Sequence, residues 1–309
     1  MNTDIFKNKK LMPPLALLCA ILWALAYPFI KLGYSELGIS SDDLGNKILF
    51  AGVRFLFAGI IVLLITNSKK KLNVKEIFNF KIFNWILLFA LVNTSLHYLF
   101  SYVGLGYIKS SRGTILDSTG CFFLIIFSCI VFSDDKMSIP KAIGCLVGFS
   151  GILLINLEPG NALFENITFL GDGMILLNAL CAAFGGLISR VVSRKIDMTV
   201  ATGMSMAVGG GILCIVGIIA HPYRLWNLTL PGFFLLLALI LISAISFSIY
   251  NSLLANHPIS KVAIFNAFIP VFGVCFSSII LGEAFNWKYL VAGIMTTIGT
   301  YLANLETKK

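Results

Sequence analysis

Charged residues are scarce in this sequence of 309 amino acids: they make up 12% of the chain, against about 25% in an average soluble domain. A soluble fold of this length needs a polar surface, and this composition does not supply one. Hydrophobic residues account for 58% of the chain, and its mean hydropathy is +0.93. The lack of charge therefore excludes an ordinary water-soluble domain and indicates a protein whose main solvent is lipid.

The sequence also lacks the residue patterns that catalysis and metal binding require. The three histidines, His97, His221 and His257, are far apart, and no H-E-x-x-H, C-x-x-C or phosphate-loop pattern occurs. All seven cysteines fall within apolar stretches, where cysteine packs as a small hydrophobic residue. We therefore expect no enzyme activity, no metal and no cofactor.

A stretch of about 20 apolar residues is long enough to cross the hydrocarbon core of a bilayer as a helix. Ten stretches meet this length, and the connections between most of them are short and polar. The sequence thus predicts an all-α integral membrane protein with ten transmembrane helices, roughly at 12–33, 47–66, 83–105, 113–132, 138–156, 171–191, 199–220, 231–252, 261–281 and 287–304.

The basic residues indicate the orientation of these helices. With the N-terminus inside, sixteen of the 23 lysines and arginines fall on the cytoplasmic side and five fall outside. Because cytoplasmic loops are enriched in lysine and arginine, this bias predicts that both termini are cytoplasmic, in a multi-pass protein of the plasma or inner membrane. It also explains the net charge of +9 without a nucleic-acid partner.

A weak internal repeat divides the chain at about residue 160. Ser111–Asp117 aligns with Ser260–Asn266 at an offset of 149, and Asn156–Glu158 aligns with Asn304–Glu306 at 148. Five helices per copy is an odd number, so the second copy must enter the membrane from the opposite side. The pattern predicts two inverted five-helix repeats, residues 1–160 and 161–309, as in many secondary transporters.

Several motifs resemble the EamA branch of the drug/metabolite transporter superfamily. These are Trp23…Pro28…Lys31 in the first helix, Arg54-Phe55 in the second, and Asn266…Pro270…Gly282-Glu283 in the ninth. The resemblance covers the whole chain, although Gly120 stands where the first repeat of the family usually has proline. It implies a ten-helix carrier with a central cavity walled by helices 1, 3, 4, 6, 8 and 9. Members of the family export diverse metabolites, so it does not identify the substrate.

Polar residues within the expected spans are the candidates for that cavity. On helix 3, Asn93, His97 and Ser101 share one face, and Tyr98 and Tyr102 lie on the adjacent face. Such a stripe either lines a wet cavity or bonds to a neighbouring helix; we expect the cavity. The candidate substrate-binding residues are Trp23, Tyr27, Asn93, His97, Tyr98, Ser101, Tyr102, Asp117, Asn178, Ser246, Tyr250 and Asn266.

Charged residues within the spans carry open alternatives. Asp117, expected about one turn inside the outer end of helix 4, either pairs with Arg54 or Arg112 or binds a substrate ammonium or a proton. Lys31 and Arg190 are repeat partners that either snorkel to the interface or make gate contacts. We take Lys31, Arg54, Arg112 and Arg190 as gating or charge partners, and expect Glu283 to face water at a helix end.

These observations favour a secondary transporter of a small polar or zwitterionic metabolite, such as an amino acid, with export as the expected direction. The alternative is an integral-membrane enzyme or a channel without carrier activity. The partners expected are the small-molecule substrate and the lipid bilayer, and a homodimer is left open. Proteoliposome uptake separates a carrier from an enzyme, and single-channel recording separates it from a channel.

Overall fold

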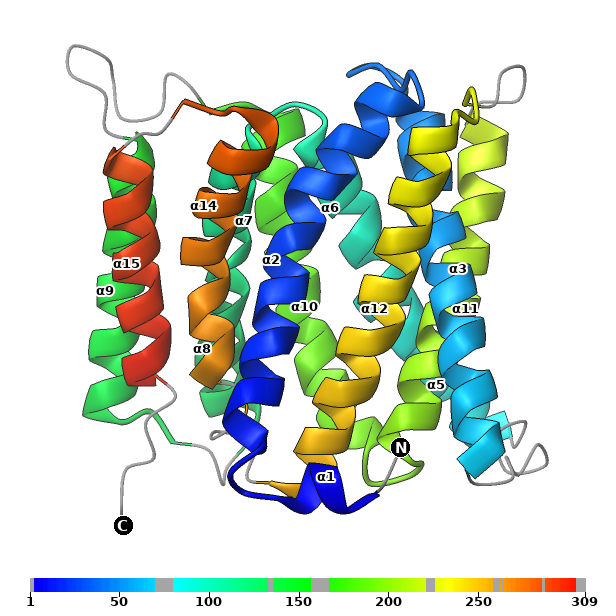
Figure 1. Cartoon of the computed structure of the whole chain (residues 1–309). Helices are drawn as coiled ribbons and strands as arrows, with labels where there is room; N and C mark the ends of the chain where they lie inside the picture. Colours follow the sequence, from blue (N-terminus) through cyan, green and yellow to red (C-terminus); the bar gives the residue numbers. More distant parts are fainter. Residues whose placement is uncertain are drawn as a thin grey trace.

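The computed structural model describes residues 3–69, 80–132, 136–156, 167–220, 226–257, 262, 264–284 and 287–303. All regular secondary structure in these ranges is helical, and the helices form one upright bundle (Figure 1). The elements are α1 (Thr3–Lys7), α2 (Met12–Glu36), α3 (Leu44–Lys69), α5 (Phe80–Ala90), η1 (Leu91–Leu96), α6 (His97–Leu105), α7 (Ser110–Asp117), α8 (Thr119–Val131), α9 (Ile139–Asn156), η2 (Phe169–Gly173), α10 (Met174–Val192), α11 (Met198–Ala220), α12 (Leu230–Asn256), η3 (Ile264–Phe268), α14 (Ile269–Leu281) and α15 (Trp287–Ala303).

The starts of several helices follow from local sequence. Prolines occupy the first turn of α2, α12 and α14, where the missing N–H would have no intrahelical partner. Thr229 caps α12 by accepting a hydrogen bond from the Gly232 N–H at 3.1 Å. At the other end of α14, Gly282 has a φ of 63°, a left-handed conformation that glycine adopts without strain.

Seven helices are long and apolar enough to cross a membrane, and two apolar helices, Ile139–Leu154 and Phe265–Leu281, are shorter. The prediction of an all-helical, multi-pass membrane protein is therefore confirmed, whereas the number ten stays a prediction. The seven are Met12–Glu36, Leu44–Ser68, Ile82–Leu105, Ser110–Val131, Phe169–Val192, Met198–Ala220 and Leu230–Leu253.

Three of the expected spans are interrupted in ways that periodicity did not predict. A π-helical segment, η1, separates α5 from α6, and a second one, η2, begins the span that continues as α10. A 3₁₀ segment, η3, precedes α14, which has Pro270 in its first turn. Such segments shift the rotation of the residues that follow and often occur at functional sites.

Glycines set the closest helix contacts. A Cβ on Gly210 of α11 would overlap the backbone of α3 at Leu56, and Cβ atoms on Gly144 of α9 and Gly299 of α15 would overlap each other's helix. These two pairs, α3 with α11 and α9 with α15, lie at opposite edges of the bundle (Figure 1). Between them α2 packs on α12 and α14, and α10 packs on α8 and α6. Small residues thus allow both outer pairs to approach at backbone distance.

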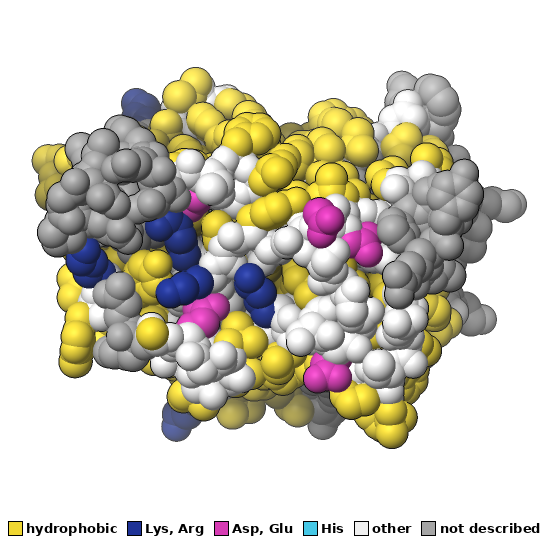
Figure 2. Space-filling view, turned by 90° about the horizontal axis from the view of Figure 1, so that it is seen from above, with side chains coloured by type: hydrophobic (Ala, Val, Ile, Leu, Met, Phe, Trp, Pro, Cys, Tyr) yellow, Lys and Arg dark blue, Asp and Glu magenta, His cyan; other side chains and the backbone are white. Residues whose placement is uncertain are grey.

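The two ends of the bundle differ in the groups that they present. Both termini lie at one end, the lower one in Figure 1. The opposite end, which we call the far end, has lysine or arginine and acidic side chains near its centre and hydrophobic side chains toward its rim (Figure 2). A polar centre with an apolar rim is the surface expected for a bundle surrounded by lipid.

Candidate functional site

Asp117 lies at the junction of α7 and α8 and brings together three of the predicted site residues. The Tyr27 hydroxyl of α2 donates to Asp117 Oδ2, and the Asn178 amide of α10 donates to Oδ1. Asn178 is buried, while Tyr27 and Asp117 are half-buried. Since α7 starts at Ser110, Asp117 lies about two turns from the helix start, deeper than the one turn expected.

Neither predicted arginine partner pairs with Asp117. Arg112 pairs instead with Asp172, with 2.5 Å between Nε and Oδ1. Arg54 donates to Ser243 Oγ and to the Tyr102 hydroxyl, both at 2.9 Å, and its guanidinium lies over the Phe55 ring. Within the described part of the chain, the only hydrogen-bond donors to Asp117 are thus neutral, while the two arginines bond to other groups.

A second group of predicted residues lies beside this cluster, one turn along α2. The Trp23 and Tyr250 rings meet edge to face with centroids 4.9 Å apart, and the Asn266 amide donates to the Tyr250 hydroxyl at 3.0 Å. Trp23 and Tyr27 are four residues apart and share one face of α2. The aromatic pair therefore extends the Asp117 cluster toward α12 and η3, and we call the two groups together the central cluster.

Several buried polar atoms of the central cluster have no hydrogen-bond partner in the described structure. They are Trp23 Nε1, His97 Nδ1, Asn178 Oδ1 and Asn266 Oδ1. The His97 ring lies near the backbone of Asn178, so it belongs to the same region. Most buried polar atoms in proteins are satisfied, and a concentration of unsatisfied ones beside a carboxylate is a feature of binding sites.

The polar residues of helix 3 face two neighbouring helices, with Asn93 and His97 against α10 and Thr94 and Ser95 against α11. Thr94 and Ser95 bond to α11, through Ser205 Oγ at 2.8 Å and the Gly209 carbonyl at 3.1 Å. Asn93 packs against Gly185 of α10. The Tyr98 ring stacks on Phe55 with centroids 3.7 Å apart.

Three other predicted substrate residues are fully or nearly buried in packing contacts. Tyr102 is buried between Arg54 and Tyr34, whose hydroxyl donates to the Tyr102 carbonyl at 2.6 Å. Ser101 is 6% exposed, and the Ser246 hydroxyl donates to the Ile242 carbonyl of its own helix at 2.6 Å. These contacts favour a packing role for the three residues. The positions of polar residues along the third and eighth expected spans did not distinguish that role from substrate contact.

Two of the charged residues predicted as gating or charge partners, Arg190 and Lys31, lie near opposite ends of the bundle. Arg190, in the last turn of α10, lies over the Phe132 ring at 4.2 Å. Lys31 is half-buried near the far end of α2 and interacts electrostatically with Glu283.

Glu283 itself does not simply face water, as we expected, but binds the start of α7. Its Oε1 accepts from the Ser110 N–H at 2.7 Å, and its Oε2 accepts from the Ser111 N–H at 3.2 Å and the Ser111 hydroxyl at 2.5 Å. The repeat alignment placed these two segments at different positions of their halves, and no sequence signal indicated that they meet.

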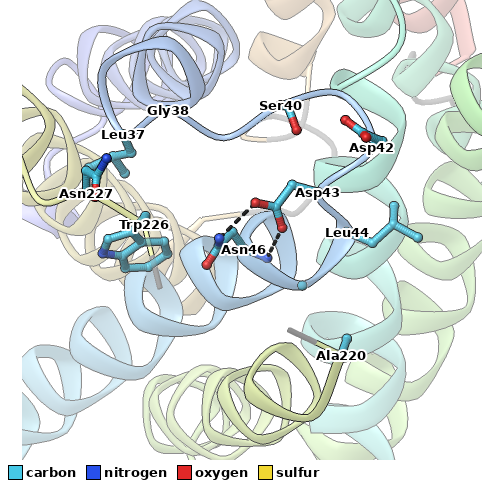
Figure 3. Close-up of a pocket in the computed structure, with 11 residues that line it drawn as sticks. Leu37, Gly38, Ser40, Asp42, Asp43, Leu44, Asn46, Ala220, Trp226 and Asn227 are labelled. Carbon is cyan, nitrogen blue, oxygen red and sulfur yellow. Dashed lines mark hydrogen bonds between the residues drawn. The ribbon is translucent and has the colours of Figure 1, made fainter. Parts of the chain in front are cut away.

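A hollow of about 600 Å³ opens at the far end, apart from the central cluster. Figure 3 shows its lining, in which Asp43 faces Asn46 and accepts hydrogen bonds from that residue's N–H and amide, at 3.0 and 2.8 Å. A hydrogen bond from the Ser40 side chain lowers the pKa of the neighbouring Asp42. The hollow's polar groups thus serve mainly to order the loop that joins α2 to α3.

Comparisons with known proteins agree with this fold. The EamA-like transporter family matches residues 11–157 and 169–305. The "Uncharacterized transporter sll0355" of Synechocystis is 27% identical, with 98% of this chain and 91% of that protein covered. The "Uncharacterized transporter YvbV" of Bacillus subtilis is 24% identical, with 93% and 90% covered.

A plant protein and a solved structure extend the comparison. The "WAT1-related protein At3g02690, chloroplastic" of Arabidopsis thaliana is 27% identical over 71% of this chain and 54% of its own length. A crystal structure with 15% sequence identity matches with a TM-score of 0.67, covering 93% of this chain and 96% of the other, and this likeness supports the fold alone. With two family matches that together span most of its length, the chain belongs to the EamA-like transporter family and is a multi-pass membrane protein.

Proposed function

We propose that the protein is a secondary transporter that exports a small polar or zwitterionic metabolite, such as an amino acid or a related compound. The observation that carries this proposal is Asp117, a half-buried carboxylate within a span, whose described hydrogen-bond donors are both neutral side chains. An ionised carboxylate in a membrane span costs about 2.5–3.5 kcal/mol even on the lenient insertion scale. A site that keeps this charge without a cationic side chain is suited to a cationic group of the substrate.

Arg54 supports a substrate with both signs of charge. It is 3% exposed, and its hydrogen bonds go to the neutral groups of Ser243 and Tyr102. Tyr27 interacts electrostatically with both Asp117 and Arg54, so both charges lie near the same tyrosine. A zwitterion would place its ammonium toward Asp117 and its anionic group toward Arg54.

The inverted repeat supports alternating access as the mechanism. We assign the halves to residues 1–160 and 161–309, with α2, α3, α5–α6, α7–α8 and α9 corresponding to α10, α11, α12, η3–α14 and α15. Under this correspondence, the contact of α2 with α12 becomes the contact of α10 with α6. In the same way, the contact of α2 with α14 becomes the contact of α10 with α8. The pairs α3 with α11 and α9 with α15 map onto themselves. Two such halves can open alternately to either side.

The transport experiment compares charge classes of substrate. Purified protein is reconstituted into liposomes loaded with one unlabelled pool at a time: neutral amino acids, amines, organic acids or sugars. Uptake of the labelled compound from outside is then measured as counterflow, which needs no knowledge of the coupling ion. We expect counterflow with the zwitterionic pool, and ligands from that pool should raise the melting temperature by mass action.

Two variants identify which charge reads which substrate group. Arg54→Gln should weaken the counterflow of zwitterions and leave that of amines unchanged, whereas Asp117→Asn should weaken the counterflow of both. The control is Glu36→Gln, because Glu36 is an exposed carboxylate at the far end. Counterflow with organic acids alone would contradict the role of Asp117. Absence of counterflow with every pool, together with single-channel currents or a chemically altered substrate, would replace the carrier by a channel or an enzyme.

A further inference from the structure

Glu283 joins two helices from different halves of the sequence at the far end. It follows Gly282, which ends α14, and its carboxylate accepts three hydrogen bonds from Ser110 and Ser111 at the start of α7, over 2.5–3.2 Å. The first N–H groups of a helix have no intrahelical acceptor, and the helix dipole favours a negative charge there. The contact therefore satisfies orphan donors of one half with an anion from the other.

A second contact holds the same turn of α7 to α10. Arg112 Nε lies 2.5 Å from Asp172 Oδ1, while Asp172 Oδ2 accepts from the Thr168 N–H at 3.0 Å. Asp172 is 2% exposed. One turn of α7 is thus fixed to α14 through Glu283 and to the start of α10 through Arg112. We call these two contacts the far-end clasp.

The clasp acts on the helices that carry the central cluster. Asp117 follows Ser110 by seven residues, about 10 Å along a helix, and Asn178 follows Asp172 by six, about 9 Å. Below the clasp, the Thr114 side chain of α7 packs directly on Gly273 of α14, where an added Cβ would meet Thr114 Oγ1 at 2.6 Å. Lys31 of α2 also interacts electrostatically with Glu283. Solvent from the far end can reach Asp117 along this seam only when α7 and α14 separate.

We propose that Glu283 is a latch: bound to the start of α7 it keeps the central cluster closed toward the far end, and its release opens that side. The latch rests on the alternating access of the proposed function, but it assigns to Glu283 a role that concerns conformation and not substrate contact. The carboxylate suits this role because Glu283 itself is only half-buried at the far end, so water can replace its hydrogen bonds when the helices part.

The test measures access to the central cluster without any substrate. Cys121 lies on α8, four residues beyond Asp117 and half-buried, so it reports on that region. The other six cysteines, Cys19, Cys129, Cys145, Cys181, Cys214 and Cys275, are replaced by serine. A small membrane-impermeant thiol reagent is added from the far-end side of vesicles of known orientation, and labelling at residue 121 is followed by mass spectrometry.

Glu283→Gln should raise the labelling rate of Cys121 about tenfold, because losing a charge-assisted set of hydrogen bonds shifts a closed–open equilibrium by roughly that factor. Ser111→Ala, which removes one of the three donors, should raise it less. Glu36→Gln is the matched control and should leave the rate unchanged. Equal labelling of Glu283→Gln and the parent would overturn the proposal.

A crosslink keeps the proposal testable when Glu283→Gln fails to fold. In the double variant Ser111→Cys/Glu283→Cys, oxidation should suppress labelling of Cys121 from the far-end side about tenfold, and reduction should restore it. Labelling that is equally fast in the oxidised and reduced protein would show that α7 and α14 need not part, and the latch would be wrong. Because labelling needs no substrate, a failure of the transport proposal appears only in counterflow and leaves this result interpretable.

Discussion

The central cluster and the far-end clasp both contain carboxylates, yet the charges of these carboxylates have different surroundings. In the clasp, Glu283 binds backbone N–H groups and Asp172 binds the Arg112 guanidinium. In the central cluster, Asp117 binds a tyrosine hydroxyl and an asparagine amide, and neighbouring buried atoms have no partner in the described structure. In the clasp each carboxylate has a positive counterpart, the start of the α7 dipole for Glu283 and Arg112 for Asp172, whereas Asp117 keeps a negative charge that a bound cation can neutralise.

The comparison is tested most strongly by neutralising Asp117. Asp117→Asn should reduce counterflow about 100-fold or more, because the ammonium of the substrate loses its counter-charge. It should leave the melting temperature unchanged or raise it, since removing an uncompensated charge from a span is not destabilising. Counterflow with the preferred substrate and differential scanning fluorimetry measure the two effects. A variant that unfolds but transports normally when refolded would assign Asp117 to stability and remove the contrast.

The second prediction removes a carboxylate of the clasp that has a charged partner. Asp172→Ala should lower the free energy of unfolding by about 3 kcal/mol, because it leaves the Arg112 guanidinium without its buried partner. The double variant with Arg112→Met should recover part of that loss, which a double-mutant cycle in detergent measures. Substrate affinity of the folded fraction should stay within about twofold of the parent. A large loss of affinity without a loss of stability would place Asp172 in the binding site.

A milder change separates the contribution of a hydrogen-bond donor to Asp117 from the contribution of the carboxylate charge. Tyr27→Phe removes one hydrogen bond to the carboxylate and keeps the ring, so substrate affinity should fall about fivefold, equivalent to roughly 1 kcal/mol. Isothermal titration with the counterflow substrate measures this change. An affinity loss as large as that of Asp117→Asn would mean that the tyrosine hydroxyl, and not the carboxylate, is the main contact.

The smallest effect is expected where a predicted site residue lies in packing contacts. Ser246→Ala removes a hydroxyl that bonds only within its own helix, so both affinity and stability should change by less than about 0.5 kcal/mol. The same titration and scanning measurements apply. A fivefold or larger loss of affinity would return Ser246 to the substrate site and enlarge the central cluster toward α12.

The sequence predicted the helical membrane fold well, because apolar length is a strong constraint on a chain in lipid. It also selected Tyr27, Asp117, Asn178, Trp23, Tyr250 and Asn266, which the structure brings together in the central cluster, since polar side chains in spans are conspicuous. It did not separate them from Ser101, Tyr102 and Ser246, which are buried in packing. The reason is that neighbouring helices decide which polar side chains are enclosed, as Arg54 and Tyr34 enclose Tyr102, and the period along one helix does not report those neighbours.

Partners between distant segments were the part that sequence reasoning missed. Arg112 was considered for Asp117, five residues away, although its partner Asp172 lies on another helix. Glu283 was assigned to water because a glutamate after a helix C-terminus is usually solvated, and its binding to α7 depends on the tertiary arrangement of two halves. Charge pairing in a bundle follows the neighbours of a helix in space, which periodicity does not report.

The glycine contact between α9 and α15 bears on how the chain is assembled during synthesis. α9 contributes one of the shorter apolar helices, and α15, the last of the described helices, has 17 residues; neither is among the seven long apolar ones. Gly144, Gly148 and Gly151 on α9 meet α8 or α15 at distances that exclude a Cβ, so in a nascent chain that lacks α15 part of this face has no partner. That part of the α9 face is therefore covered only once α15 has been synthesised and inserted. A chain that stops before Trp287 should be retained by the insertion machinery or degraded, and the first half expressed alone should not accumulate as a stable product.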